Sequence, residues 1–287
     1  MSPSSPVIKV ISAGIYAALQ DAGRYGYRHL GVPVSGAMDT QSLYYVNHVL
    51  QNNINSPAIE ILGHGAKFEI LEEVRLCVSG ASGIIHLDGK NTTPHQPFFA
   101  KKGQILYIQK IITGARFYLG ISGGFFAEPV MQSVSTINGT HLGPLKKNEV
   151  LRRNIDVIRG NSQNSRLIHH TIDKTKPIQA LHGPEYHFLS ETSAANLMNA
   201  TYTITNENNR MGYRLSGPAL YTVVAHNNLL TSAVLPGTVQ LLPGGQLILL
   251  MRECQTTGGY PRVLQVEEAS INQLAQRWAS DSIRFLI

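Results

Sequence analysis

The chain has 287 residues, of which 43% are hydrophobic and only 15% are charged. This composition excludes a fully disordered chain, because it provides enough apolar residues for one large domain or two modest ones. The formal net charge is +6, but the basic residues are scattered and form no run of five or six, which argues against a nucleic-acid-binding protein.

Several features indicate a soluble protein of the cytoplasm. The first 16 residues contain no charged region followed by an apolar core, so no signal peptide is expected. No apolar stretch reaches the roughly 18 residues of a membrane-spanning helix. The two cysteines, Cys77 and Cys254, are far apart and in no metal-binding spacing, which indicates buried thiols in a reducing compartment.

Short runs rich in β-branched and aromatic residues dominate the chain. They are bounded by Gly, Pro and Asn, which is typical of a mainly β protein with a barrel or sandwich fold. The predicted strands cover residues 7–12, 66–71, 74–80, 83–89, 104–111 and 116–122, followed by 201–206, 239–251 and 261–266.

Two helices are expected between these strands. Asp39 is placed to cap a helix over residues 39–52. Ser270 and Gln273 form a possible capping box at the start of a second helix, over residues 270–279. The expected apolar faces are Leu43, Val46 and Leu50 in the first helix, and Ile271, Leu274, Ala275 and Trp278 in the second.

Three motifs occur in the same order in both halves of the chain. RYGYR at 24–28 resembles RMGYR at 210–214, Gly103-Gln104 parallels Gly245-Gln246, and SGGF at 122–125 parallels TGGY at 257–260. A repeated order predicts two similar domains. We place them at residues 1–170 and 171–287 and leave open whether their strands interleave.

The glycine-rich stretch at residues 19–39 follows neither a helical nor a strand period and predicts an ordered loop that presents polar groups. Its Arg24 and Arg28, with Arg210 and Arg214 in the second motif, offer planar guanidinium groups for a carboxylate or a phosphate. In the alternative interpretation, each arginine only ties a loop to an acid, the choices being Asp21, Asp39, Glu60 and Glu207.

The second polar motif is QTTGGYP at 255–261. Hydroxyls and free backbone amides at a tight turn can stabilise the negative charge that develops on an amide or ureido oxygen. The alternative is a plain β-turn with Gly258 and Gly259 at positive φ. The sequence contains no phosphate-binding G-x-x-x-x-G-K-[ST] loop and no Met-Lys pair of a biotin attachment site.

QDAGRYGYRHLGVPVSGAMD at 20–39, AIEI at 58–61, RMGYRLSGPAL at 210–220 and QTTGGYP together resemble the biotin-dependent carboxyltransferase-like family over nearly the whole chain. This family includes the C-type subunit of bacterial 5-oxoprolinase, the KipA proteins and the carboxyltransferase region of urea carboxylase. The resemblance implies two cyclophilin-like β-barrel domains. For a bacterial chain of this size it also implies a 5-oxoprolinase subunit that acts with A- and B-type subunits, uses ATP with Mg through the complex and carries no biotin itself.

In the lactam hydrolysis that this resemblance implies, arginines would hold phosphate or the substrate carboxylate, and Gln255, Thr256 and Thr257 would bind the amide oxygen. The expected catalytic residues are Asp21, Arg24, Arg210, Gln255, Thr256 and Thr257. The expected substrate-binding residues are Arg28, Asp39, Glu60, Tyr213, Arg214, Gly258 and Tyr260. No metal site is expected on this chain.

Two alternatives remain open within the same family. A biotin-dependent carboxyltransferase would use the turn for the ureido oxygen of carboxybiotin, and a KipA-type regulator would bind a partner without catalysis. The chain also departs from the family pattern. Residues 133–151 lack a G-G-x-x-G-R loop, and Glu253 is the nearest acid before QTTGGYP, where an aspartate is usual.

Overall fold

The structure, a computed structural model, describes residues 4–154, 172–223 and 229–287. It divides into two compact units, which consist of Met1–Arg24 with Asp39–Ile172, and of Tyr25–Met38 with Asp173–Ile287. The predicted boundary between residues 170 and 171 lies outside the described residues. Residues 25–38, the middle of the glycine-rich stretch, therefore belong to the second unit although both of their flanks belong to the first.

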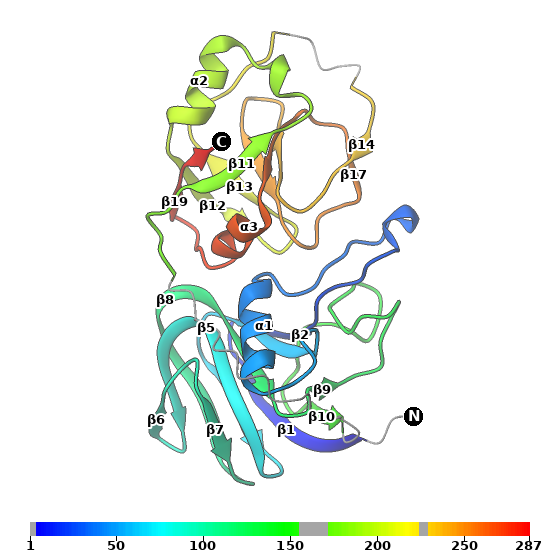
Figure 1. Cartoon of the computed structure of the whole chain (residues 1–287), viewed down its shortest axis with the longest axis vertical. Helices are drawn as coiled ribbons and strands as arrows, with labels where there is room; N and C mark the ends of the chain where they lie inside the picture. The colour runs from blue at the N-terminus through cyan, green and yellow to red at the C-terminus, as the bar shows by residue number, and fades with distance from the viewer. Residues whose placement is uncertain (1–3, 155–171, 224–228) are drawn as a thin grey trace. The chain divides into compact units, whose positions relative to one another are not determined.

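The first unit is built on a ten-stranded antiparallel sheet that curls into a half-barrel (Figure 1). β5 (Val74–Leu87) pairs with β8 and also carries β6 (Lys90–Thr92) and β7 (Pro97–Ala100). The strand order along the main path is β2 (Tyr16–Gln20), β3 (Ala58–Leu62), β8 (Ile105–Ile121), β4 (Ala66–Ile70), β1 (Ser4–Ala13), β10 (Val150–Asn154) and β9 (Phe125–Phe126).

Four predicted strands of this unit merge into two long ones. Residues 74–80 and 83–89 fall in β5, and residues 104–111 and 116–122 fall in β8. Register shifts on both sides of Ser82 let β5 remain paired with β8 through the glycine-containing middle. Gly83 is needed there, because a Cβ atom on it would lie 2.1 Å from the carbonyl oxygen of Lys110 in β8. Gly83, which the sequence placed at the start of a separate strand, thus permits close pairing of β5 with β8.

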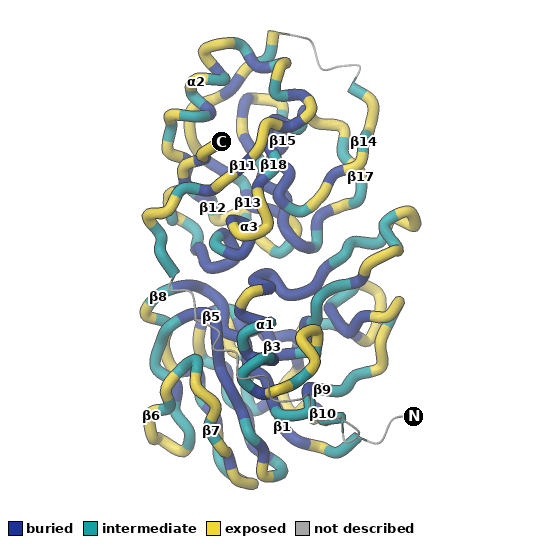
Figure 2. Tube along the Cα trace, viewed as in Figure 1, coloured by how far each residue is buried: buried dark blue, intermediate teal, exposed yellow. Residues whose placement is uncertain are grey.

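The α-helix α1 (Thr40–Val49) packs on β5 and β8 (Figure 1). The side chain of Asp39 accepts a hydrogen bond from the backbone amide of Ser42 at 3.1 Å, which confirms the predicted cap. The helix packs closely on β8, as Gly120 of that strand shows: a Cβ atom on Gly120 would lie only 2.7 Å from Cγ2 of Val46. Leu43, Val46 and Leu50 are buried as expected, and Figure 2 shows burial along β5 and on part of this helix, whereas β6 and β7 are mainly exposed.

The second unit contains an eight-stranded sheet that nearly closes into a barrel. A separate ribbon pairs β14 (Ser232–Ala233) with β17 (Thr257–Gly258). The only parallel pair described in this sheet joins the last two strands of its order. That order is β19 (Ser282–Ile283), β12 (Tyr202–Asn208), β13 (Gly212–Ser216), β16 (Leu247–Leu250), β15 (Thr238–Leu241), β18 (Arg262–Val266), β11 (Ile178–His182) and β20 (Phe285–Leu286).

Helices of the second unit differ from the prediction. The helix α2 (Glu191–Asn199) was not expected from the sequence, and Ser190 caps it through the amide of Ser193 at 3.2 Å. The capping box at Ser270 is wrong, since α3 (Glu268–Leu274) begins earlier and the Ser270 hydroxyl accepts the backbone N–H of Gln179. Ile271, Leu274 and Ala275 are buried as expected, whereas Trp278 is partly exposed. In the described part of the chain, no helix combines the length and apolar character needed to cross a membrane.

The mainly β prediction is confirmed, but the repeated motifs do not all mark equivalent structures. Gly103 and Gly245 have φ angles of 86° and 87°, and each precedes a strand by two residues. RYGYR instead lies in a loop that enters the 3-10 helix η1 (Arg28–Leu30), whereas RMGYR enters strand β13. The similarity of the two arginine motifs therefore does not give them the same local backbone.

Candidate functional site

In the first unit, Asp21 binds the start of the 133–151 loop. Its carboxylate accepts hydrogen bonds from the hydroxyls of Ser133 and Ser135, at 2.7 and 2.6 Å, and from the backbone amide of Val134 at 2.8 Å. It also accepts one from the amide of Gly23 at 2.9 Å. Asp21 thus joins the glycine-rich stretch to a segment more than 100 residues away.

Arg24 is completely buried beside this junction. Its Nε donates to the carbonyl oxygen of Val130 at 3.0 Å, and its Nη2 donates to the carbonyl oxygens of Ser133 and Ser135 at 3.5 and 2.8 Å. These contacts make Arg24 a scaffold for residues 130–135. Its expected catalytic role stays a prediction, and the geometry favours action through the loop over direct contact with a ligand.

Asp39 and Glu60 lie in a buried network of the same unit. The Tyr118 hydroxyl donates to Glu60 Oε2 at 2.7 Å and accepts the backbone N–H of Asp39 at 2.8 Å. Arg116 approaches Glu60 Oε1 at 3.6 Å. Burial, and then the negative charges of Glu60 and Asp39, raise the pKa of Tyr118 well above its usual value, so its proton is retained. The network fixes the start of α1.

In the second unit, Arg28 holds the β14–β17 ribbon. Its Nη2 donates to the carbonyl oxygens of Val234 and Thr256, the latter at 3.3 Å. Cys254 lies next to it; burial raises the pKa of this thiol to about 11, against the smaller opposing effect of the Arg28 charge. Arg28 was expected to bind an anion, a role that remains a prediction, whereas the contacts described here orient the turn.

Arg210 and Tyr213 are also engaged inside the second unit. Arg210 donates to Glu253 Oε1 at 2.7 Å and to the carbonyl oxygen of Gly36 at 2.5 Å. Glu253, the acid noted before QTTGGYP, therefore binds an arginine of the repeated motif. Tyr213 is 1% exposed and belongs to the hydrophobic core of the barrel.

Arg214, Gln255 and Tyr260 meet at a pocket of about 300 Å³ on the outer side of the barrel sheet. Arg214 forms an ion pair with Glu207 at 2.9 Å, and the two side chains are 43% and 75% exposed. This pairing was one of the alternatives offered for the arginines. An exposed pair of this kind is weak, so Arg214 is the one arginine of the four candidates that can readily exchange its partner for an anion.

The turn at residues 256–260 is less strained than a positive-φ turn. Gly258 and Gly259 both have φ outside the range from +20° to +160°, so the plain-turn interpretation was wrong in this respect. Gly258 nevertheless lies in a confined position, because a Cβ atom on it would lie 2.6 Å from Nε2 of Gln240 and would have to displace that carboxamide. Thr257 is exposed, and the carbonyl of Thr256 accepts hydrogen bonds from Arg28 and the amide of Val234.

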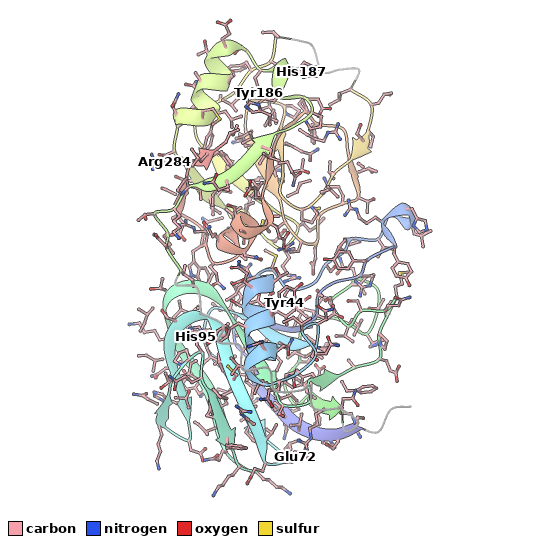
Figure 3. The ribbon with its side chains drawn as sticks, in the orientation of Figure 1. Tyr44, Glu72, His95, Tyr186, His187 and Arg284 are labelled. Carbon is pink, nitrogen blue, oxygen red and sulfur yellow. The ribbon has the colours of Figure 1, made fainter. Side chains whose placement is uncertain are left out.

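Two residues that sequence reasoning missed, Arg262 and Glu185, also support this turn. Arg262 donates to both carboxylate oxygens of Glu185, at 2.8 and 2.6 Å, and to the carbonyl of Ala233 at 2.9 Å. Glu185 precedes the 3-10 helix η2 (Tyr186–Phe188), whose Tyr186, labelled in Figure 3, stacks on His182 with ring centroids 3.7 Å apart. Arg262 directly follows QTTGGYP, and its position next to this motif was the sequence feature that could have identified it.

The predicted residues thus gather in two places, Asp21, Arg24, Asp39 and Glu60 in the first unit and the remainder in the second. Among the described residues, His, Cys, Asp and Glu side chains form no group of three or more that would hold a metal ion. A family profile described as carboxyltransferase domain, subdomain A and B, matches residues 30–287. The chain belongs to this carboxyltransferase-domain family.

Two curated members of the family align along almost the whole chain. The chain is 33% identical over 283 residues to the C-type subunit of 5-oxoprolinase from Escherichia coli, an alignment that covers 98% of this chain and 91% of that protein. It is 31% identical over 285 residues to the C-type subunit of 5-oxoprolinase from Haemophilus influenzae, with 97% and 90% covered.

Solved structures show the same fold. The crystal structure of the Kluyveromyces lactis urea carboxylase superposes with a TM-score of 0.88 at 26% identity, over 99% of this chain but only 28% of that one. A further solved chain superposes with a TM-score of 0.88 at 23% identity, and this chain spans 56% of its length. The carboxyltransferase-domain fold is therefore shared by proteins much longer than this one.

Proposed function

We propose that this chain is the C-type subunit of an ATP-dependent 5-oxoprolinase, which acts with A- and B-type subunits in the cytoplasm. The observation that carries the proposal is its 33% identity to a protein of that name over nearly the full length of both. The proposed reaction adds the oxygen of water to the ring carbonyl carbon of 5-oxo-L-proline, breaks the ring C–N bond and leaves the nitrogen protonated in L-glutamate.

ATP with Mg would make the ring carbonyl easier to attack by transferring its γ-phosphoryl group to the amide oxygen, with release of ADP. After the ring opens, a second water would release the phosphoryl group as inorganic phosphate. The sequence has no glycine-rich phosphate loop with its lysine, so an autonomous nucleotide site of the P-loop type is not expected on this chain. We therefore place the nucleotide on the partner subunits and assign this chain the tasks of binding and orienting the lactam.

The pocket beside QTTGGYP is the proposed lactam site. Arg214 exchanges Glu207 for the substrate carboxylate, a change that costs little because the existing pair is exposed. Gln255 and the hydroxyls of Thr256 and Thr257 are proposed to bind the amide oxygen as negative charge develops on it. Arg28 keeps the turn in place through the carbonyls of Thr256 and Val234, and Arg262 does so through the carbonyl of Ala233 in β14.

A carboxyltransferase role is the second candidate, favoured by the TM-score of 0.88 to the Kluyveromyces lactis urea carboxylase. In that role the same turn would hold the ureido oxygen of a biotin carried by a partner, since this chain has no Met-Lys pair. The two roles share the pocket and differ in whether a biotinylated partner is required.

The test is ATP-dependent glutamate release from 5-oxo-L-proline by this chain, by candidate A- and B-type subunits, and by the three mixed. Activity that appears only in the full mixture supports the oxoprolinase role. Absence of activity while the three proteins still co-purify contradicts it and favours a KipA-type regulatory role. Activity of the A- and B-type subunits without this chain also contradicts it.

A further inference from the structure

Gln240 of β15 carries a hydrogen-bond acceptor that the protein does not satisfy. Its side chain is 0% exposed, and its Nε2 donates to the carbonyl oxygen of Tyr260 at 3.4 Å. Its Oε1 has no hydrogen-bond partner within the described residues, and solvent does not reach it. A buried acceptor without a donor opposes folding, and because this one borders a pocket, a ligand in that pocket can supply the missing donor.

Gln240 borders the pocket that contains Arg214, Gln255 and Tyr260. In the sheet, Gln240 lies opposite Ile248, and Ile248 lies opposite Arg214. Adjacent strands are about 4.8 Å apart, so the Cα atoms of Gln240 and Arg214 are separated by roughly 10 Å. The pocket of about 300 Å³ that these two side chains line together with Ile248 leaves room for a small ring with a carboxylate.

The carboxamide of Gln240 packs against Gly258 of the turn. Gly258 lies so close that a Cβ atom would be 2.6 Å from Gln240 Nε2, while a Cβ atom on Gly259 would meet only Thr231 Oγ1 at 3.5 Å. Of these two glycines, only Gly258 lies close to the carboxamide. The terminal torsion of a glutamine is soft, so a ligand in the pocket can turn the oxygen toward itself.

We propose that Gln240 Oε1 accepts a hydrogen bond from the ring N–H of a cyclic amide or ureide, while Arg214 binds the carboxylate of the same molecule. This inference rests on the proposed function, because it names the residue that recognises the N–H group of that substrate. A lactone of the same shape places a ring oxygen where the N–H belongs. Two acceptors then face each other, and the site rejects the lactone.

The test measures binding of 5-oxo-L-proline and of its lactone counterpart to the isolated chain by ligand-observed NMR, without ATP or partners. The wild type is expected to prefer the lactam by about tenfold or more, and Gln240→Leu to lose this preference. Gln273→Leu is the matched control, because Gln273 in α3 has a buried Oε1 that also lacks a partner among the described residues but does not border the pocket. It should keep the preference.

Three results overturn the inference: the wild type binds neither compound, it binds both equally, or Gln240→Leu retains the preference. Circular dichroism checks folding, and Gln240→Met replaces the leucine variant if that one does not fold. The outcome is separable from the oxoprolinase assay. Selective binding with an inactive three-subunit mixture refutes only the proposed function, whereas an active mixture without selectivity refutes only the role of Gln240.

Discussion

Arg262 donates to both carboxylate oxygens of Glu185, at 2.8 and 2.6 Å, across 77 residues of sequence. The hydrogen bonds from Arg262 hold the pKa of Glu185 below its ordinary value of 4.5. A carboxyl group whose pKa is lower in the folded state adds stability above its unfolded pKa and loses it as the pH falls through the folded value. This pair therefore makes part of the stability of the second unit pH-dependent.

The substitution Glu185→Gln should remove this contribution to the pH dependence of the stability of the second unit. The variant is expected to be less stable at pH 7, and its melting temperature should fall less steeply than that of the wild type as the pH drops below about 4.5. The measurement is the melting temperature of both proteins from pH 7 to pH 3. Parallel curves would show that the Glu185 carboxylate does not contribute in this way.

The stability cost of replacing an arginine of the repeated motifs should depend on how far that arginine is buried. Arg24→Ala removes a fully buried guanidinium that holds carbonyls of residues 130–135 and should cost at least about 2 kcal/mol of unfolding free energy. Arg214→Ala removes a side chain that is 43% exposed and should change stability by less than about 0.5 kcal/mol. Urea denaturation of both variants tests this, and equal losses would contradict the distinction.

Asp39→Ala should destabilise α1 by about 1 kcal/mol, since the variant loses the cap at the Ser42 amide. Asp39→Asn is the control, because an asparagine side chain also caps helices. Denaturant midpoints of the two variants are the measurement. A similar loss in both would indicate that the charge of Asp39, more than its capping oxygen, supports the network with Tyr118.

The adjacent glycines of the turn should respond differently to one added methyl group. Gly258→Ala places a Cβ atom 2.6 Å from the Gln240 carboxamide and must displace it, whereas Gly259→Ala meets Thr231 Oγ1 at an ordinary 3.5 Å. We expect weaker lactam binding in the first variant and unchanged binding in the second. Titration of both variants with 5-oxo-L-proline measures their affinities. Equal affinities would show that the position of the Gln240 carboxamide is unimportant for lactam binding.

Both cysteines should resist alkylation in the folded protein. Burial raises the pKa of Cys77 to about 12 and that of Cys254 to about 11. At pH 8 the thiolate fraction of Cys254 is then about one in a thousand, and thiolate is the reactive form. Mass spectrometry after iodoacetamide treatment should find modification only in denaturant. Rapid labelling of the native chain would show that the protein opens locally around one of these two cysteines.

The features predictable from the sequence were those determined by neighbours along the chain. The Asp39 cap depends on residues within one helical turn, and β1 or β4 follow from short β-branched runs, so local patterns were sufficient. The partners of Arg24 lie more than 100 residues away, and no periodicity encodes such a contact. Ser270 failed as a cap for the same reason, because its hydroxyl is occupied by the distant amide of Gln179.

The residues of the candidate site also divide into those that the local sequence reveals and those that only the fold reveals. Arg214 and Tyr260 were found because their motifs are conspicuous in composition. Gln240 was missed because it lies within an ordinary strand, β15 with the sequence TVQL. Its importance follows only from the turn packed against it and from its unsatisfied oxygen. A buried polar residue is invisible to sequence reasoning until the fold shows what surrounds it.

Residues 25–38 belong to the second unit, while the residues before and after them belong to the first. During synthesis, this segment leaves the ribosome long before the strands of the unit to which it belongs. Arg28 can therefore bind the carbonyls of Val234 and Thr256 only after those residues have been made. A gene split after codon 172 would separate Arg28 from both carbonyls. The second fragment would then regain its native turn only when the first fragment, or a peptide of residues 25–38, is supplied in trans.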